Sequence, residues 1–384
     1  MGAPATRIGI LGGGQLGLML AEAAPDLGVT CAALDAQGAD APASRVVDVT
    51  AGDVSRREDV VRFGSDFDVV TIEVERVSAA GMRDLEARGV VVHPSARVVE
   101  TIQDKGTQKA WLAASGFPTS AFATYPDAAG LREAVAAGVR PIPFVQKARR
   151  EGYDGRGVVV VREEADLAGL LDVPCVAEDL VAIATEVAVV VARGRGGAHA
   201  TFDPVEMVFR PGANILDVLV CPARIPDALA AASRRLAVRV AEAIDIVGVL
   251  AVEMFVDTDG ELWVNELAPR PHNSGHHTIE ACTTSQYGQH LRAISGRPLG
   301  ATEPRRSAVL VNVLGAPGIA RGTPRYLGRD AVEAMPGVHL HLYGKRVTWS
   351  MRKMGHVTIV DDDVNRALAT AVEVRNTLRV ASDP

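Results

Sequence analysis

Two apolar segments separated by Asp259-Gly260 constrain the fold of this 384-residue chain more than any other feature. Asp-Gly between apolar segments is a strong signal for a β-hairpin. If these two residues form the loop, antiparallel pairing places Glu253 directly opposite Glu266. Like charges that face each other destabilise a sheet, and buried carboxylates are costly without compensation. The hairpin therefore predicts a bound cation, since Mg²⁺ is typically held by one or two carboxylates together with substrate phosphates.

An exposed hairpin with solvated acids is the alternative. The four apolar residues Val252, Phe255, Leu262 and Val264 argue against it, because they have the pattern of core positions. Strict alternation also places Asn265 on the face opposite to that of the next residue, the second acid. The strand must therefore twist or end there if both side chains contact one metal ion.

The N-terminal hundred residues alternate between strand and helix patterns, which predicts a doubly wound parallel sheet. Ligands of such sheets bind beyond the carboxyl ends of the strands. A helix is expected at about residues 15–24. The expected strands are residues 7–11, 29–34, 46–49, 69–72 and 90–92.

A glycine-rich turn follows the first predicted strand. Gly12, Gly14 and Gly17 have the spacing of a dinucleotide fingerprint, and Asp35 lies at a suitable distance for a ribose-binding acid. An NAD-dependent oxidoreductase would use these residues. The same backbone suits the phosphate of a nucleoside monophosphate, because the helix N-terminus offers unpaired N–H groups. A tight turn without any ligand also remains open.

Two acids end the strand expected near residues 69–72. Glu73 and Glu75 are two positions apart, which predicts that both lie on one face. They could then receive a cationic or amine-bearing substrate. Solvated acids are the alternative, and the sequence does not separate the two.

Beyond residue 100 the pattern changes to a helix from Asp104 to Gly116, and then to a strand that carries Lys147. A glycine-rich turn at residues 152–157 follows this strand. A lysine beside such a turn is typical of a phosphate-binding arrangement in which the loop closes over the ligand. Arg149, Arg150 and Arg156 favour this interpretation over a mobile hairpin with solvated basic side chains.

Three further features suit a nucleotide. The strand at residues 173–181 ends in Glu178-Asp179, where backbone groups could bind a base and a carboxylate a ribose. Glu186 interrupts an apolar strand and is either functional or exposed at an edge. A basic cluster near the C-terminus is a candidate phosphate site or a solvated hairpin; it comprises Lys345, Arg346, Arg352 and Lys353.

Composition argues against two classes of partner. The net charge of −7 lacks the basic footprint of general nucleic-acid binding. No apolar run approaches the length of a membrane span, since Glu186 interrupts the longest candidate. The first six residues lack the basic start of a signal peptide, and the four scattered cysteines form no metal spacing or disulfide framework. We therefore expect a cytoplasmic protein without nucleic-acid or membrane partners.

Six motifs occur in order across nearly the whole chain: IGILGGGQLGLML, DKGTQK, GYDGRG, VNELAPRPHNSGHHTIEAC, YGK and RKMGH. In them the chain resembles the N5-carboxyaminoimidazole ribonucleotide synthetases of the ATP-grasp superfamily. The resemblance implies an α/β protein with an α+β central part. It implies a Rossmann-like domain at 1–100 that is not an NAD site, an ATP-grasp unit at 101–300 with a lid at about 115–182, and a small C-terminal domain at 301–384.

The resemblance also implies a reaction. ATP phosphorylates bicarbonate to carboxyphosphate, and the carboxyl group passes to the amine of 5-aminoimidazole ribonucleotide (AIR). Closure of the loop at 152–157 would exclude water from this labile intermediate. Mg²⁺ is the implied metal and a homodimer the implied assembly. Another ATP-grasp ligase or transformylase, the NAD-dependent oxidoreductase and a catalytically silent ADP-binding module remain as alternatives.

Site residues follow from the matched motifs, group by group. For ATP they are Lys105, Lys147, Gly152, Tyr153, Asp154, Gly155, Arg156, Gly157, Glu178, Asp179, Leu180, Val181, Glu186, Arg210, Asn265 and Glu266. For AIR they are Gln15, Leu16, Glu73, Glu75, Arg270, His272, Asn273, Ser274, Lys345 and Arg352. The implied metal ligands are Glu253 and Glu266, and the candidate catalytic residues are Tyr153, Asp154, Arg156, His276 and Lys353. Asp154 could deprotonate or orient the AIR amine, and His276 could carry a proton or orient its neighbours.

Four positions depart from the family's pattern. Arg210 stands where a histidine is usual, Ala188 where a serine is usual, and His277 where an aromatic residue is usual. Residues 348–351 (TWSM) replace a common Pro-Gly pair. None of the four removes an implied metal ligand or phosphate-binding lysine, and the first concerns an ATP contact.

Overall fold

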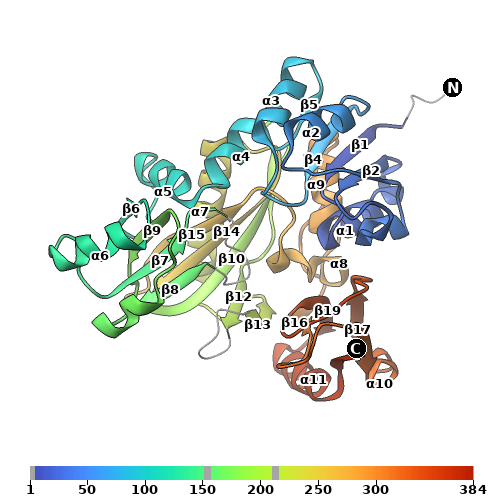
Figure 1. The fold of residues 1–384 in the computed structure, drawn as a ribbon. Helices are drawn as coiled ribbons and strands as arrows, with labels where there is room; N and C mark the ends of the chain where they lie inside the picture. The colour runs from blue at the N-terminus through green and yellow to red at the C-terminus, as the bar shows by residue number, and fades with distance from the viewer. Residues whose placement is uncertain (1–4, 151–156, 210–215, 384) are drawn as a thin grey trace.

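The computed structural model of the protein describes residues 5–150, 157–209 and 216–383. The chain passes through three parts in order (Figure 1): an N-terminal part, a central part and a C-terminal part that lies below the other two. No helix among the described residues is both long and apolar enough to cross a membrane.

A five-stranded sheet with parallel strands forms the N-terminal part, in the order β3-β2-β1-β4-β5. Apolar side chains fill both of its faces, with Ile8 and Ile10 on one and Leu11 on the other. The predicted doubly wound sheet is thus confirmed. Its strands are β1 (Arg7–Leu11), β2 (Thr30–Asp35), β3 (Val49–Ala51), β4 (Val69–Ile72) and β5 (Val91–Val92). Its helices are α1 (Gln15–Ala23), α2 (Arg57–Gly64), α3 (Ala79–Ala87) and α4 (Ala96–Ile102), with 3₁₀ turns η1 (Pro25–Leu27), η2 (Gly38–Asp40) and η3 (Pro42–Arg45).

Helix α5 (Lys105–Ala114) leads into a small lid. The lid is an antiparallel sheet in the order β6-β9-β7-β8, with a core around Leu131 and Phe144. Its elements are β6 (Phe122–Tyr125), α6 (Ala128–Ala136), β7 (Phe144–Ala148), β8 (Val158–Val161), η4 (Glu164–Gly169) and β9 (Cys175–Asp179).

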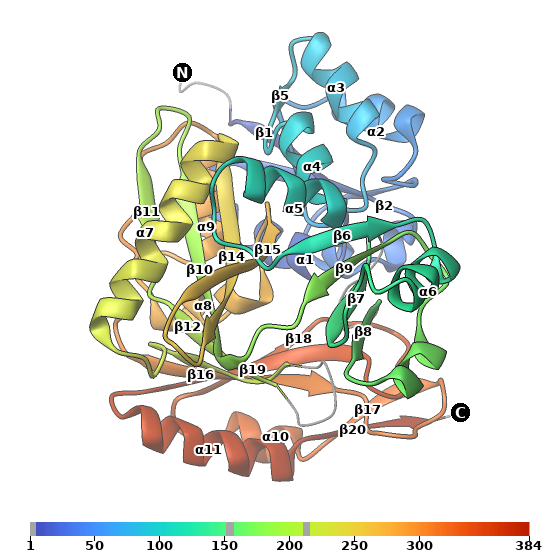
Figure 2. The same cartoon turned by 90° about the vertical axis from the view of Figure 1, so that its left-hand side faces the viewer.

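A nine-stranded antiparallel sheet joins the central and C-terminal parts, because β13 pairs with β16. In Figure 2 its strands run from the middle of the molecule to the C-terminal part at the bottom. Its central elements are β10 (Ile183–Arg193), β11 (His199–Thr201), β12 (Val205–Phe209), β13 (Leu216–Cys221), β14 (Gly248–Asp257) and β15 (Leu262–Ala268). Helix α7 (Asp227–Ile244) contributes to the core of the central part.

The C-terminal part packs its last helix and strands around Val309, Val357 and Val374. Its elements are β16 (Ser307–Leu314), β17 (Thr323–Leu327), α10 (Arg329–Glu333), β18 (Val338–Leu342), β19 (Lys353–Asp361), α11 (Val364–Thr377) and β20 (Arg379–Asp383). The segment between β15 and β16 contains η5 (Asn273–Gly275), α8 (Thr278–Ala281) and α9 (Gln286–Ile294).

The apolar pattern of the sequence predicts one continuous helix from about Thr278 to Ile294, stopped by Gly296-Arg297-Pro298, and this prediction is wrong. The chain leaves the helix after Ala281 and starts again at Gln286. The hydroxyl of Ser285 accepts a hydrogen bond from the Gly288 N–H, so this residue caps a new helix. Hydroxyl side chains compete with the helical backbone and favour caps, which explains the break.

Candidate functional site

The hairpin of β14 and β15 places Glu253 opposite Glu266, as predicted, but its loop was predicted wrongly. The Asp257 N–H donates to the Glu261 carbonyl at 3.0 Å, so three residues form the loop. Gly260, the last of the three, has a φ of +85°, as is usual for three-residue hairpin loops. The Asp257 carboxylate accepts from the Trp263 indole at 2.8 Å and helps to hold this turn.

A β-bulge at Asn265 corrects the register. Met254 pairs with Val264, whereas Glu253 pairs with Glu266, so Asn265 is the extra residue of β15. A bulge locally changes the side to which a side chain points. As a result the side chains of Asn265 and Glu266 both reach lysines of the site, and the predicted conflict of strict alternation disappears.

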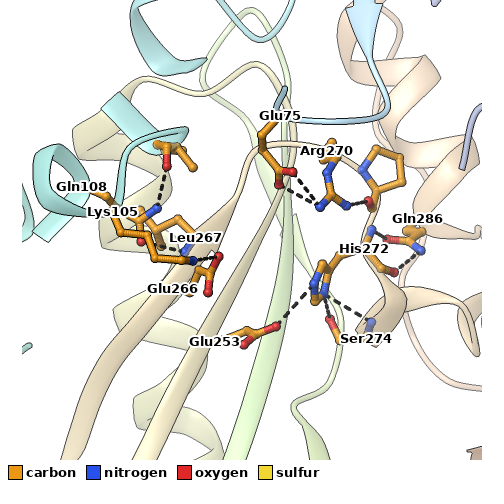
Figure 3. A network of polar contacts seen from close by, with 12 residues as sticks. Glu75, Lys105, Gln108, Glu253, Glu266, Leu267, Arg270, His272, Ser274 and Gln286 are labelled. Carbon is orange, nitrogen blue, oxygen red and sulfur yellow. Dashed lines mark hydrogen bonds and ion pairs between the residues drawn. The ribbon is translucent and has the colours of Figure 1, made fainter. Parts of the chain in front are cut away.

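Two lysines come to this hairpin from different elements. Lys105 begins α5 and pairs with Glu266 (Figure 3). Lys147 lies in β7 and donates to Asn265 Oδ1 at 2.7 Å. The helix that carries Lys105 is fixed at its start, because the Asp104 carboxylate accepts from the Gly106 and Thr107 N–H groups.

The carboxylates of the hairpin are electrostatically unequal. Burial and the facing Glu266 raise the pKa of Glu253 well above its ordinary value. Burial alone would also raise the pKa of Glu266, but the Lys105 ammonium outweighs it and lowers that pKa. Nearby on β10, burial raises the pKa of Glu186 to about 7. An additional positive charge would stabilise this cluster, which we call the charged cleft: Lys105, Lys147, Glu186, Glu253 and Glu266.

The donor set of the charged cleft fits a divalent cation with few protein ligands. Among residues 5–150, 157–209 and 216–383 no group of three or more His, Cys, Asp or Glu side chains is arranged for a metal. Two facing carboxylates are what Mg²⁺ needs when phosphates supply other ligands. His272 Nε2 lies 3.3 Å from a Glu253 oxygen and links the cleft to the segment that follows β15.

The glycine-rich turn is already occupied by two carboxylates of the protein. Glu73 accepts from the Gly14 and Gly17 N–H groups at 3.0 and 3.3 Å, and Asp35 accepts from the Gly13 N–H at 3.0 Å. A pyrophosphate would need these same donors. The N–H donors and the carboxylate that an NAD site would need are therefore already paired with each other in the protein.

Glu73 and Glu75 do not share a face as predicted, because β4 ends at Ile72 and alternation stops there. Glu73 turns into the glycine-rich turn, whereas Glu75 pairs with Arg270 at 2.8 Å. Figure 3 shows Arg270 and His272 on the segment beyond β15, with Gln286 holding the backbone of His272. Ser274 Oγ lies 2.9 Å from His272 Nδ1 and orients that ring.

The basic cluster near the C-terminus divides into two groups. Lys345 Nζ reaches Gln15 Oε1 at 3.1 Å and so joins the C-terminal part to the glycine-rich turn. It also donates to the carbonyl of Lys353 at 2.8 Å. Arg346 instead pairs with Asp40 at the surface, and the Arg352 guanidinium stacks on Trp349 at 3.9 Å. The first group therefore lies beside Gln15, one of the predicted AIR residues.

Glu178 and His276 are both buried and are held by neighbouring side chains. The Glu178 carboxylate lies between Lys109 and Lys147. Lys109 is a residue that the sequence reasoning missed; its spacing of four from Lys105 on one helix was the available signal. His276 is fully buried, bonded to Tyr287 and held neutral by burial, which lowers its pKa. These contacts favour the orienting role for His276 over that of a proton carrier.

The remaining predicted site residues lie near the ends of strands or outside the described residues. Gly157 directly precedes β8 and has a φ of +82°. Leu180 and Val181 connect β9 to β10. Asp179 pairs with the buried Arg140 at 2.7 Å, and Asn273 starts η5 beside His272. The predicted residues Gly152, Tyr153, Asp154, Gly155, Arg156 and Arg210 lie outside the described residues.

Comparisons with known proteins agree along most of the chain. Residues 5–103 match the ribonucleotide synthetase preATP-grasp domain, residues 110–287 the ATP-grasp domain, and residues 308–370 the phosphoribosylaminoimidazole carboxylase C-terminal domain. The N5-carboxyaminoimidazole ribonucleotide synthase of Bacillus subtilis is 36% identical over 362 residues, which cover 93% of this chain and 92% of that protein.

Solved structures are also similar. The N5-carboxyaminoimidazole ribonucleotide synthetase of Thermotoga maritima superimposes with a TM-score of 0.89 at 39% identity, covering 98% of this chain and 100% of that one. The Aspergillus clavatus synthase in complex with ADP and 5-aminoimidazole ribonucleotide gives a TM-score of 0.86 at 30% identity, covering 97% of this chain and 99% of that one.

Proposed function

The chain belongs to the N5-carboxyaminoimidazole ribonucleotide synthase family, and from this premise we propose its function and the roles of its residues. It is an ATP-dependent ligase that carboxylates the amino group of AIR with bicarbonate in purine biosynthesis. Bicarbonate attacks the γ-phosphorus of ATP and yields carboxyphosphate and ADP. The AIR amine then gains the carboxyl group, while phosphate leaves and the amine loses a proton.

The charged cleft binds the ATP phosphates. Phosphoryl transfer depends mainly on positioning and on neutralising negative charge. Lys105 and Lys147 have acidic or amide partners in the protein, and phosphate oxygens replace these partners when ATP binds. Lys105 is suited to this exchange because its side chain is 14% exposed and its partner Glu266 is 41% exposed.

Glu253 and Glu266 hold Mg²⁺ in this proposal. The support is their opposed position on β14 and β15 and the raised pKa of Glu253, which burial and then the facing Glu266 cause. When bound, Mg²⁺ supplies charge neutralisation to the phosphate oxygens of ATP. The protein's contribution is the rigid hairpin, whose bulge directs Asn265 and Glu266 to the same cleft.

AIR binds between the charged cleft and the glycine-rich turn. Arg270 and His272 face the cleft from the segment beyond β15, and Gln15 and Lys345 meet at the turn. Lys345 and Lys353 supply positive charge for the ribose phosphate of AIR. Glu73 holds the turn itself, so its role is to shape the AIR site rather than to receive the amine. Assembly as a homodimer and a cytoplasmic location remain expectations of the same proposal.

The single observation that carries this proposal is the pair of facing carboxylates beside two lysines from separate elements. The test is ADP release measured with ATP, Mg²⁺ and bicarbonate, with and without AIR. We expect AIR to stimulate ADP release and NAD to show no binding by calorimetry. Stimulation by another amine, without any by AIR, would contradict the substrate assignment while leaving an ATP-grasp ligase.

A further inference from the structure

Helix α5 carries two lysines four residues apart, and each of them pairs with a glutamate of the central part. Lys105 belongs to the charged cleft. Lys109 lies one turn further on and is sealed, since its side chain is 3% exposed and that of its partner Glu178 is 4% exposed. Residues four apart lie on one face of a helix, so α5 presents both ammonium groups to the same region.

Lys109 has no freedom to leave its place. Its Nζ lies 2.8 Å from Glu178 Oε2 and donates to Thr119 Oγ1 and Ser120 Oγ at 2.7 Å each. An ammonium group has three donors, and these three partners use all of them. A ligand phosphate therefore has no donor to take from Lys109, whereas Lys105 pairs with the partly exposed carboxylate of Glu266, which a phosphate can replace.

Glu178 connects Lys109 to the phosphate-binding lysine of the cleft. Its Oε2 faces Lys109 and accepts from Ser120 Oγ at 2.8 Å, while its Oε1 lies 3.0 Å from Lys147 Nζ. Lys147 and Glu178 are diagonal neighbours on paired strands β7 and β9, because Val145 pairs with Glu178. The carboxylate is thus a fixed bridge between one sealed and one functional lysine.

From this geometry we propose that Lys109 is a positioning residue for ATP binding. It acts through Glu178, which holds Lys147 in position and leaves its ammonium group able to bind a phosphate oxygen. With both ammonium groups in place, the single charge of Glu178 is shared between them. Lys147 then remains free to exchange an acceptor for a phosphate oxygen. Without Lys109, the carboxylate attracts Lys147 alone in a poorly solvated site, and phosphate must compete with it.

Burial and charge at this bridge agree with that role. Burial alone would raise the pKa of Glu178, but Lys147 and Lys109 outweigh it and lower that pKa to about 2. Burial lowers the pKa of Lys109 to about 8, although Glu178 opposes this effect. Glu178 therefore keeps its negative charge at neutral pH.

The inference rests on the proposed role of Lys147 in nucleotide binding, and its test is a double-mutant cycle read out as KM values. Lys109→Met is expected to raise the KM for ATP about tenfold and to change the KM for AIR by less than about twofold. The reason is that only Lys147, which binds the ATP phosphates, is drawn out of position. Glu178→Gln should raise the KM for ATP less than Lys109→Met does, because it loses the group that positions Lys147 but also removes the carboxylate that competes with phosphate. In the Glu178→Gln background, adding Lys109→Met should change the KM for ATP by less than about twofold, because the two residues act as one unit.

Three outcomes would overturn the proposal. One is an equal effect of Lys109→Met with and without Glu178. Another is a fall in melting temperature with unchanged KM for ATP, which would mean an ion pair that serves stability alone. The third is an equal rise in both KM values. Lys109→Gln, which keeps a donor for Thr119 and Ser120, replaces Lys109→Met if that variant does not fold. If the unmodified chain binds no ADP in calorimetry, the proposed function itself fails, which is a distinguishable result.

Discussion

Titratable side chains gather in two regions of this protein, the charged cleft and a second cluster where the three parts meet. We call the second cluster the histidine junction: His276, Tyr287, His341, Tyr343 and His356. In the cleft, charged groups face each other, and the side chains of Glu253 and Glu266 remain partly exposed, at 21% and 41%. In the junction the rings pack against one another: His341 stacks on His356 and His276 is tilted against it, with ring centroids 4.6 Å apart in each pair.

The two regions compensate burial differently. In the cleft every lysine lies beside an acid or amide, and phosphates can exchange for these partners. In the junction, Tyr287 OH lies 2.7 Å from His276 Nδ1 and Tyr343 OH lies 2.9 Å from His356 Nδ1. The Nε2 atoms of both histidines have no hydrogen-bond partner among the described residues. Such rings are tolerated when neutral, so the junction suits a permanent contact between parts and the cleft suits a ligand.

Removing an acid of the cleft gives the largest expected effect and tests the assignment of that region to function. Glu266→Gln should lower the turnover number for AIR-stimulated ADP release at least about 100-fold, because a preorganised charge at the phosphates is lost. The melting temperature should change by only a few degrees, since the side chain is partly exposed. Glu261→Gln, at an exposed position of the same hairpin, is the matched control and should keep full turnover. If Glu266→Gln does not fold, Glu266 serves stability, and the assignment of the cleft to function alone is contradicted.

Acid should sharpen the comparison, because the two regions titrate with opposite sign. Burial lowers the pKa of the junction histidines His276 and His356 below their unfolded value of 6.5. It does the same for three buried histidines outside the junction: His93, His277 and His290. The unfolded chain then binds more protons, so their contribution is complete above pH 6.5 and falls as pH drops below it. Glu186, whose pKa burial raises to about 7 from 4.5, binds its proton in the folded chain and opposes this loss between pH 7 and 4.5.

The measurement is the free energy of unfolding in urea between pH 7.5 and 5. Each histidine that stays neutral in the folded chain contributes a loss of about 1.4 kcal/mol per pH unit below 6.5. His356→Phe should therefore flatten the profile by about that slope, and Glu186→Gln should steepen it below pH 7. A profile that His356→Phe leaves unchanged would show that the junction accepts protons in the folded state.

The sequence predicted the cleft better than the details that build it. Glu253 faces Glu266 as expected, yet through two compensating features, a three-residue loop and a bulge at Asn265. The bulge depends on a distant segment: the Val264 N–H donates to the Pro118 carbonyl at 2.7 Å, and Thr119 Oγ1 donates to the Val264 carbonyl at 2.8 Å. No pattern within the hairpin reports such a contact, so alternation alone could not place Asn265.

The doubly wound sheet was predictable because both its strands and its helices carry local periodic patterns. The occupation of its glycine-rich turn was not, because Glu73 reaches Gly14 from 59 residues away and only after β4 ends. The histidine junction was equally hidden, since it joins residues of α9, β18 and β19 that share no local motif. Local patterns thus gave the elements, whereas tertiary contacts decided which side chains meet.

The smallest expected effect separates two buried histidines that the sequence makes look alike. His277 and His290 are both at most 1% exposed. The ring of His290 is fully used, since Nε2 lies 2.7 Å from Thr71 Oγ1 and Nδ1 accepts from the Val249 N–H at 3.1 Å. Neither ring nitrogen of His277 makes a hydrogen bond of good geometry within the part of the chain that the structure describes, although the Ser274 backbone lies near the ring and slightly opposes the fall in its pKa. His277→Phe should therefore raise the free energy of unfolding by about 1 kcal/mol at pH 7.5, because two buried polar atoms disappear.

His290→Phe should lower the free energy of unfolding by about 2 kcal/mol, because it leaves a buried hydroxyl and a buried N–H unpaired. Urea unfolding of both variants measures the difference, and equal losses would mean that His277 is satisfied after all.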